Sequence, residues 1–264
     1  MNNLIVQKFG GTSVANTERF QAVADLVVDS INSGTNVAVV VSAMAGETQR
    51  LINLAKELQE TPDPREYDAL VSSGEQVSAA LLAIALKERN FLSKSYTAHQ
   101  LGLVTDNSHG RARINSIDTS ALKKDIESGV VPVITGFQGV NSSGDITTLG
   151  RGGSDYSAIV LAKYLKAIKC VIYTDVIGVM TTDPKIYKRA RKIRVISYEE
   201  MLEMSSLGSK VMQSNSVQDA RLNRIDVNVK SSFVKNVGTL ITKRKNIICL
   251  LYTSPSPRDG LLSR

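Results

Sequence analysis

Short apolar runs alternate with helical patterns along the chain. The runs at 4–9, 37–41, 130–134 and 170–173 are nearly continuous and rich in Val and Ile, which is typical of strands buried on both faces of a parallel sheet. Between them, apolar residues recur three and four positions apart, as in amphipathic helices, over 20–31, 51–58, 77–85 and 159–165. This alternation predicts an α/β fold in which layers of helices enclose a mostly parallel sheet.

Local signals place several boundaries. Pro62 and Pro64 are expected to end the second helix, and a helix should begin near Ser154. Ser197, followed three residues later by Glu200, fits a capping box at the start of a later helix. The third helix is expected to bury the face formed by Val77, Ala80, Leu81, Ile84 and Ala85.

Composition and charge narrow the classes of function. The 264 residues include 32 Lys and Arg against 25 Asp and Glu, a net charge of +7, and the 42% hydrophobic share is that of a globular protein. No uninterrupted apolar stretch reaches the ~18 residues of a membrane helix, and two cysteines without a CxxC spacing fit a reducing compartment. Scattered basic residues and 5% aromatics argue against nucleic-acid binding. We expect a cytoplasmic protein with no membrane or nucleic-acid partner.

Candidate chemistry begins directly after the first predicted strand. Ligands of parallel α/β sheets bind beyond the carboxyl ends of the strands. In the segment Lys8-Phe9-Gly10-Gly11-Thr12-Ser13, two glycines would let backbone N–H groups approach a phosphate, and Lys8 would add a positive charge. On this segment alone, a tight turn is the favoured interpretation. The chain contains no GxxxxGKS/T loop.

A second segment, 148–155, places Arg151 among three glycines just ahead of a helix. Such glycines are costly to order unless the backbone must touch something, and a guanidinium matches a carboxylate or a phosphate. Asp155 needs a cation in these surroundings, and Lys8 is the obvious candidate. This segment favours a binding function over a surface turn.

Two further segments leave alternatives open. Thr174-Asp175, with Lys185 beyond it, fits a nucleotide site or an Asx-type turn about equally well. The carboxylate of Glu75 could either stabilise the positive end of a helix dipole or bind a substrate ammonium group. His99 and His109 lie far apart, and no metal-ligand spacing or Ser-His-Asp set is present. We therefore predict no protein-held metal.

Taken in order, these segments resemble the motifs of aspartokinases, which belong to the amino acid kinase family. Each motif alone is weak, but the set is specific and covers residues 4–242. The motifs are Lys8–Ser13, Ser42-Ala43-Met44 with Gly46 and Thr48, Ser73–Glu75, Gly136–Gly139, Thr148–Asp155, Thr174–Pro184, and Glu200-Met201 through Gly208-Ser209-Lys210. The resemblance implies a three-layer αβα sandwich.

The resemblance also implies an activity and its residues. The reaction would be phosphorylation of the L-aspartate side-chain carboxylate by ATP with Mg²⁺, the first step towards lysine (through diaminopimelate), threonine and methionine. By motif, Lys8 would stabilise the transferring phosphoryl group and Asp155 would orient Lys8. The nucleotide would contact Lys8, Gly10, Gly11, Thr12, Ser13, Thr174, Asp175, Lys185 and Lys210. The amino acid would contact Thr48, Glu75, Phe137, Arg151, Gly152, Gly153 and Ser154.

The family pattern divides the chain as well. Residues 1–244 resemble the catalytic domain, whereas 245–264 match neither a packed element nor the regulatory ACT domains that usually follow. The Ser-Pro-Ser-Pro sequence at 254–257 is typical of disorder. We expect a disordered or artefactual tail, no ACT domains in this chain, and a homo-oligomer in the full-length form.

Three alternatives stay open. Another amino acid kinase would act on N-acetylglutamate, glutamate or a nucleoside monophosphate. Glu75 argues against an acetylated amine, and a nucleotide acceptor would favour more arginines. A non-catalytic ligand sensor would have no need of both Lys8 and Asp155. A truncated fragment could be too unstable to act.

Overall fold

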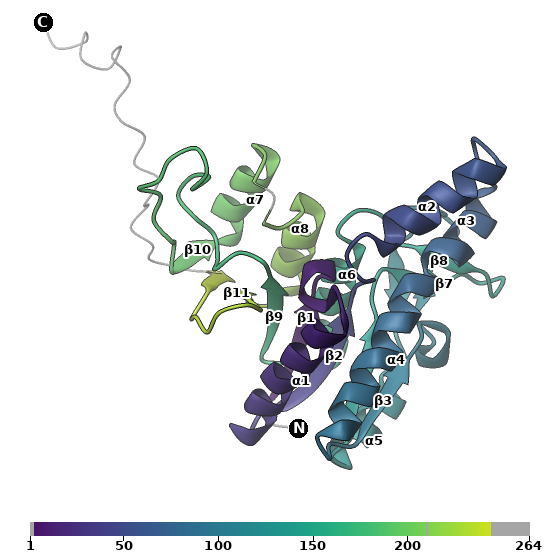
Figure 1. Ribbon diagram of the computed structural model, residues 1–264, viewed down its shortest axis with the longest axis horizontal. Helices are drawn as coiled ribbons and strands as arrows, with labels where there is room; N and C mark the ends of the chain where they lie inside the picture. The colour runs from purple at the N-terminus through teal and green to yellow at the C-terminus, as the bar shows by residue number, and fades with distance from the viewer. Residues whose placement is uncertain (1–2, 210, 244–264) are drawn as a thin grey trace, which may run out of the picture.

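One eight-stranded sheet forms the centre of the fold (Figure 1). The structure is a computed structural model that describes residues 3–209 and 211–243. Its strands lie in the order β10-β12-β11-β9-β1-β2-β6-β3, and neighbours are parallel except β11 and β12. The strands are β1 (Leu4–Phe9), β2 (Asn36–Val41), β3 (Ser93–Tyr96), β6 (Val131–Thr135), β9 (Lys169–Thr174), β10 (Val195–Ser197), β11 (Val227–Ser231) and β12 (Thr239–Thr242). The predicted α/β fold is confirmed.

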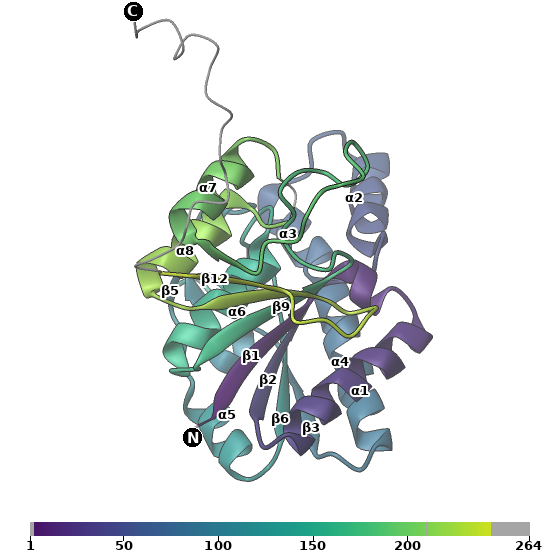
Figure 2. The ribbon, with the colours of Figure 1, turned by 90° about the vertical axis from the view of Figure 1, so that its left-hand side faces the viewer.

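Helices cover both faces of this sheet, as the turned view shows (Figure 2). One face packs against α1 (Thr17–Asn32) and α4 (Ser73–Glu88). The other packs against α5 (Ser120–Glu127), α6 (Gly153–Tyr164), α7 (Tyr198–Ser206) and α8 (Ser214–Asn223). Strands buried on both sides must be apolar at nearly every position, which explains the continuous runs in the sequence.

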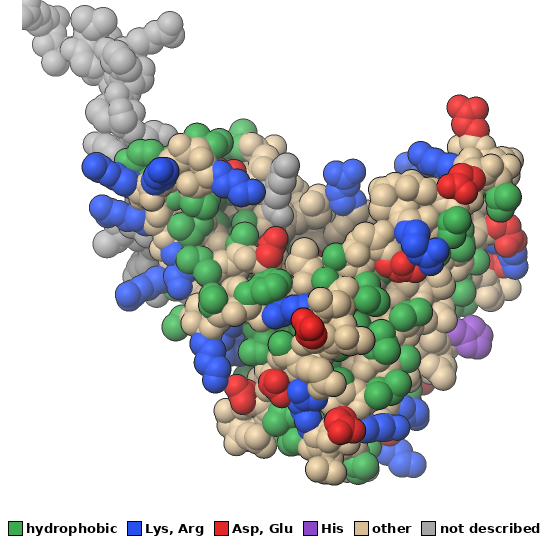
Figure 3. All heavy atoms as spheres, viewed as in Figure 1, with side chains coloured by type: hydrophobic (Ala, Val, Ile, Leu, Met, Phe, Trp, Pro, Cys, Tyr) green, Lys and Arg blue, Asp and Glu red, His purple; other side chains and the backbone are tan. Residues whose placement is uncertain are grey.

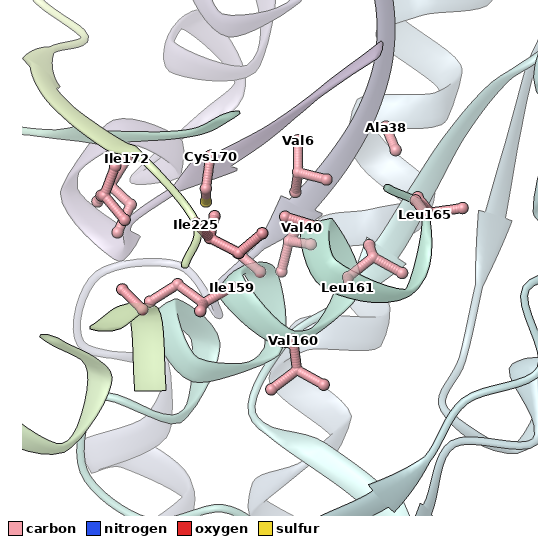
Figure 4. Packing of buried hydrophobic residues seen from close by; sticks show 14 of the residues in the cluster. Val6, Ala38, Val40, Ile159, Val160, Leu161, Leu165, Cys170, Ile172 and Ile225 are labelled. Carbon is pink, nitrogen blue, oxygen red and sulfur yellow. The ribbon is translucent and has the colours of Figure 1, made fainter. Parts of the chain in front are cut away.

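The larger core lies between the sheet and α6. Figure 4 shows Ile159 and Leu161 of α6 beside Val6 and Val40 of the sheet, all at most 2% exposed. α6 is buried over most of its length, including the polar residues of its first turn, so that turn lies inside the fold at the end of the sheet.

A second, smaller sheet lies beside the main one. It has the order β5-β4-β7-β8 and was not predicted. Its strands are β4 (Val104–Thr105), β5 (Ile114–Ser116), β7 (Gln138–Val140) and β8 (Ile146–Thr148). Segments of two or three residues are too short to show the alternation that identifies a strand.

The helix predicted over 77–85 is confirmed as part of α4, but its predicted buried face is wrong at three of five positions, since Ala85 is buried, Leu81 is partly buried, and Val77, Ala80 and Ile84 are exposed. Val77 and Ile84 are 49% and 63% exposed, whereas Leu82 and Leu86 of the neighbouring face are fully buried. The helix carries apolar residues on most of its surface, so spacing alone does not identify the side that packs against α1 and the sheet.

The two prolines after α2 (Glu47–Leu58) have different positions relative to the helices. α2 stops before Pro62 as expected, but Pro64 occupies the first turn of α3 (Pro64–Val71). Asp63 caps that helix through the N–H groups of Arg65 and Glu66.

The helical stretch Pro64–Glu88 is long and apolar enough to cross a membrane by length and composition alone. Of its most apolar 18-residue window, 56% is buried inside the protein, as in the core helix of a globular domain.

The capping box at the start of α7 is confirmed. The Glu200 N–H donates to Ser197 Oγ at 3.2 Å, and the Ser197 N–H donates to Glu200 Oε2 at 2.9 Å. We expect Ser197→Ala to lower the free energy of unfolding by about 1 kcal/mol, because one N–H of the first turn loses its acceptor. Urea denaturation measures this change. Ser206→Ala, at the opposite end of α7, serves as the control and should change it by less than about 0.5 kcal/mol.

Candidate active site

The carboxyl ends of four parallel strands meet at one edge of the main sheet. Phe9 of β1 pairs in register with Val41 of β2 and Tyr173 of β9, and Val41 pairs with Thr135 of β6. The loops after these strands enclose a cavity of about 620 Å³. Figure 3 shows the surface hollowed between the part that carries α2 and α3 and the part that carries α7 and α8. The predicted residues that line the cavity are Lys8, Gly10, Gly11, Thr12, Thr48, Glu75, Phe137, Arg151, Gly152, Gly153, Ser154, Asp155, Thr174 and Asp175.

Lys8 and Asp155 form an ion pair inside this cavity. Lys8 Nζ lies 2.6 Å from Asp155 Oδ1, and each residue is 9% exposed. Lys8 is near the end of β1, and Asp155 is in the first turn of α6, where a helix dipole favours a carboxylate. The structure therefore contains the Lys8–Asp155 pair that the sequence analysis suggested, although the two residues are 147 positions apart in the chain. This ion pair fixes the position of the Lys8 ammonium group.

The glycine loop after β1 packs tightly against the loop after β2. A Cβ on Gly11 would lie 2.9 Å from the carbonyl oxygen of Ala43, so a side chain has no room there. The Gly10 N–H donates to the carbonyl oxygen of Tyr173 at 3.2 Å, which also ties the loop to β9. Close backbone approach of this kind suits a loop whose N–H groups face an anion.

Glu75 is the one carboxylate among the lining residues that is both deeply buried and outside an ion pair. It is 3% exposed, and the Ala43 N–H donates to its Oε1 at 3.0 Å. Among the described residues, its Oε2 has no hydrogen-bond partner. Burial raises the pKa of Glu75 to about 7, against the opposing effects of the Ala43 N–H and the charge of Lys8. A helix-dipole role explains neither the burial nor the unpaired oxygen.

Phe137 holds an unusual backbone conformation at the cavity wall. Its φ is +68°, which a bulky residue adopts only where the surroundings require it. Its N–H donates to Ser157 Oγ at 3.1 Å, and that hydroxyl donates to the Gly153 carbonyl at 2.9 Å. Ser157 thus joins the loop after β6 to the first turn of α6.

We expect Ser157→Ala to lower the free energy of unfolding by about 1–2 kcal/mol, because the Phe137 N–H would lose its only side-chain acceptor. Urea denaturation at neutral pH measures this change. Ser143→Ala, on the exposed loop between β7 and β8, is the matched control and should leave the midpoint unchanged. An unaltered midpoint in Ser157→Ala would show that Phe137 keeps its conformation without this bond.

Two predicted nucleotide residues, Ser13 and Lys185, do not line the cavity, and a third cannot be placed. Ser13 is fully buried, and its hydroxyl is 2.8 Å from that of Ser232. Lys185 is exposed in the segment after β9, where its N–H donates to Asp183 Oδ1. Lys210 lies outside the described residues. The roles of these three residues stay predictions.

The loop after β2 contributes more than the single residue predicted from it. Thr48 lines the cavity, and so do Ser42, Ala43, Met44, Ala45 and Gly46, together with Gly150 of the segment after β8. The sequence contained a signal for the five residues from Ser42 to Gly46. They follow a buried parallel strand, just as Gly10 and Gly11 follow β1.

The arrangement suits a ligand that carries several negative charges and one positive charge. Lys8, Arg151, backbone N–H groups and the start of α6 supply positive potential, and Glu75 supplies a carboxylate. Within residues 3–209 and 211–243, no group of three His, Cys, Asp or Glu side chains could hold a metal ion.

Comparisons with known proteins agree with this geometry. The family model described as "Amino acid kinase family" matches residues 3–231. "Aspartate kinase Ask_LysC" of Stutzerimonas stutzeri is 53% identical over 239 residues, which are 90% of this chain and 58% of that protein. The chain thus spans less than two thirds of that relative's length.

Two solved structures are also similar. The aspartate kinase from Synechocystis has a TM-score of 0.82 and 44% identity, over 91% of this chain and 40% of that one. The E. coli aspartokinase III in complex with aspartate and ADP has a TM-score of 0.83 and 30% identity, over 92% of this chain and 65% of that one.

Proposed function

Because this chain belongs to the amino acid kinase family, we propose that it transfers the γ-phosphoryl group of ATP to the side-chain carboxylate of L-aspartate. The product is 4-phospho-L-aspartate, and the bond between the β-γ bridging oxygen and the γ-phosphorus breaks as the carboxylate oxygen bonds to phosphorus. The step leads towards lysine, through diaminopimelate, and towards threonine and methionine.

The observation that carries the proposal is the unpaired carboxylate of Glu75 in a cavity that Lys8, Arg151 and glycine-rich backbone also line. Aspartate has one ammonium group and two carboxylates, so its site needs one anion and several cations or N–H donors. Glu75 is assigned to the ammonium group and Arg151 to a carboxylate. Thr48, Phe137, Gly152, Gly153 and Ser154 complete the wall around the amino acid.

The chemistry needs no nucleophile from the protein. The aspartate side chain is already ionised at neutral pH, because the ordinary pKa of such a carboxyl is about 4, so it needs no general base either. Catalysis then consists of positioning the two substrates and neutralising charge on the transferring group. Lys8 supplies that charge, and Asp155 keeps its ammonium group aimed at the phosphates.

Mg²⁺ fits this site only as part of the nucleotide. The described residues lack a carboxylate cluster for it, and Asp155 is occupied by Lys8. The ion would neutralise phosphate oxygens when bound to ATP. Gly10, Gly11, Thr12, Thr174 and Asp175 are the cavity residues assigned to the nucleotide. Ser13, Lys185 and Lys210 keep their predicted roles there.

The wider assignments follow from the same family membership. We propose residues 1–244 as the catalytic domain, a cytoplasmic location and a homo-oligomeric full-length form. The expectation for 245–264, a disordered or artefactual tail, falls outside the described residues.

An acceptor assay tests the proposal directly. The purified chain is incubated with Mg-ATP and L-aspartate, and the acyl phosphate is trapped with hydroxylamine as a coloured hydroxamate. N-acetyl-L-glutamate, L-glutamate and UMP are tested in parallel. We expect kcat/KM for L-aspartate to exceed that for each other acceptor by at least a hundredfold. Preference for N-acetyl-L-glutamate would contradict the role of Glu75, and nucleotide binding without any turnover would favour a sensor.

A further inference from the structure

Asp68 of α3 is a buried carboxylate outside the cavity that accepts four hydrogen bonds. It is 0% exposed and does not line the cavity. Its Oδ2 accepts from His109 Nδ1, the Gly110 N–H and the Thr148 N–H, each at 2.9 Å, and its Oδ1 accepts from Thr148 Oγ1 at 2.6 Å. A buried charge is tolerated only when it is this fully satisfied.

These bonds hold the segment that carries Arg151. Thr148 ends β8, three residues before Arg151. The Thr148 carbonyl accepts from the Ala112 N–H at 2.8 Å, and a Cβ on Gly150 would lie 3.0 Å from the Gly110 carbonyl oxygen. The segments 109–112 and 148–151 therefore form one unit, which Asp68 joins to α3.

The same helix positions Glu75. α3 passes into α4 at Ser72, whose N–H donates to the Asp68 carbonyl at 3.1 Å. The Ser72 carbonyl accepts from Gln138 Nε2 at 2.8 Å, so the junction between the helices is fixed. Glu75 follows in the first turn of α4. Asp68 thus connects the element that bears Glu75 to the segment that bears Arg151.

We propose that Asp68 is a positioning residue that sets the separation of Glu75 and Arg151 and thereby governs aspartate binding, an inference that rests on the proposed function. The nucleotide half of the cavity is held by other contacts, from β1 and β9, that do not involve Asp68. Loss of Asp68 should therefore affect the two substrates unequally.

An acceptor is needed here because three of the four neighbouring groups are N–H donors, from His109, Gly110 and Thr148. Asn could still accept from all three through its amide oxygen and donate its NH2 group to the Thr148 hydroxyl, so Asp68→Leu, which accepts no hydrogen bond, is the variant that tests this role. Leu is close to Asp in size and branching, so the expected result is a displaced 148–151 segment in a folded protein. We expect KM for L-aspartate to rise at least tenfold, with KM for ATP within twofold of the wild-type value.

Two controls separate positioning from general destabilisation. Asp63→Asn changes the N-cap of the same helix to another good capping residue and should leave both KM values unchanged. Ser197→Ala lowers stability at α7, far from Asp68, and should also leave both KM values unchanged. If Asp68→Leu does not fold, Thr148→Val removes only the Oγ1 donor, and we expect it to raise KM for aspartate about threefold.

A backbone NMR readout separates this inference from the proposed function. In ¹⁵N-labelled Asp68→Leu without ligand, the amide signals of 148–153 should shift, whereas those of 8–12 should stay in place. If the wild type phosphorylates no aspartate, the proposed function fails, and the NMR comparison still decides the role of Asp68. Unshifted 148–153 signals, or an unchanged KM for aspartate in an active variant, would overturn the inference.

Discussion

Lys8→Ala is expected to lower kcat by about 10²–10³-fold, the usual effect of removing one preorganised charge from a transition state. Lys8 Nζ is held 2.6 Å from Asp155 in a site with little access to water, so solvent cannot replace it. KM for L-aspartate should change far less than kcat, because the charge on the transferring phosphoryl group develops only as the reaction proceeds. Steady-state kinetics with the hydroxamate assay measures both constants.

Several variants make the Lys8 result interpretable. Lys87→Ala removes an exposed lysine at the far end of α4 and should retain full turnover. Lys8→Ala leaves Asp155 buried without a cation, which destabilises the fold, so the folded fraction must be measured by circular dichroism. Lys8→Met with Asp155→Asn removes both charges and should restore stability without restoring turnover. Wild-type turnover in Lys8→Ala would remove Lys8 from the proposed role.

Glu75→Gln is expected to raise KM for L-aspartate by about 10–100-fold, since a hydrogen bond to a charged group contributes roughly 1.5–3 kcal/mol. The kcat should fall much less, because Glu75 is assigned to the ammonium group rather than to the reacting carboxylate. Glu88→Gln, at the exposed end of the same helix, is the control and should leave KM unchanged. A wild-type KM in Glu75→Gln would show that the ammonium group binds elsewhere.

The same variant should respond to pH in a defined direction. Burial raises the pKa of Glu75 in the folded protein to about 7, from a usual value of 4.5. Between these values the folded state binds more protons than the unfolded state, so this carboxyl makes stability fall as pH rises. Glu75→Gln removes the effect, which is worth roughly 3 kcal/mol at most.

Calorimetry at several pH values measures this difference. The Tm of Glu75→Gln should exceed that of the wild type by more at pH 8 than at pH 5. In the wild type, KM for aspartate should also rise below pH 7, as the carboxylate that meets the ammonium group becomes protonated. A Tm difference that does not depend on pH would contradict the raised pKa.

The sequence predicted the cavity better than it predicted the details of packing. Arg151 and Asp155 were identified from a glycine-rich segment just ahead of a helix, whereas Lys8, at the end of the first strand, was assigned only once the whole set of motifs resembled a known family. Neither the burial of Glu75 nor the φ of +68° at Phe137 has a comparable local signal. His109 was noted only for its lack of a metal-ligand spacing, and its partner Asp68 lies 41 residues away in the chain.

Local periodicity was therefore sufficient for the four adjacent strands β9, β1, β2 and β6, for α1, α2, α4 and α6, and for the edge of the sheet at which the cavity lies. A strand buried on both faces must be apolar throughout, and parallel neighbours bring their carboxyl ends to one side. Packing decided which face of α4 is buried, which acid accepts from His109 and Thr148, and where the pKa of Glu75 lies. Each of these depends on dehydration and on contacts between residues far apart in the chain, and no pattern of neighbouring residues contains that information.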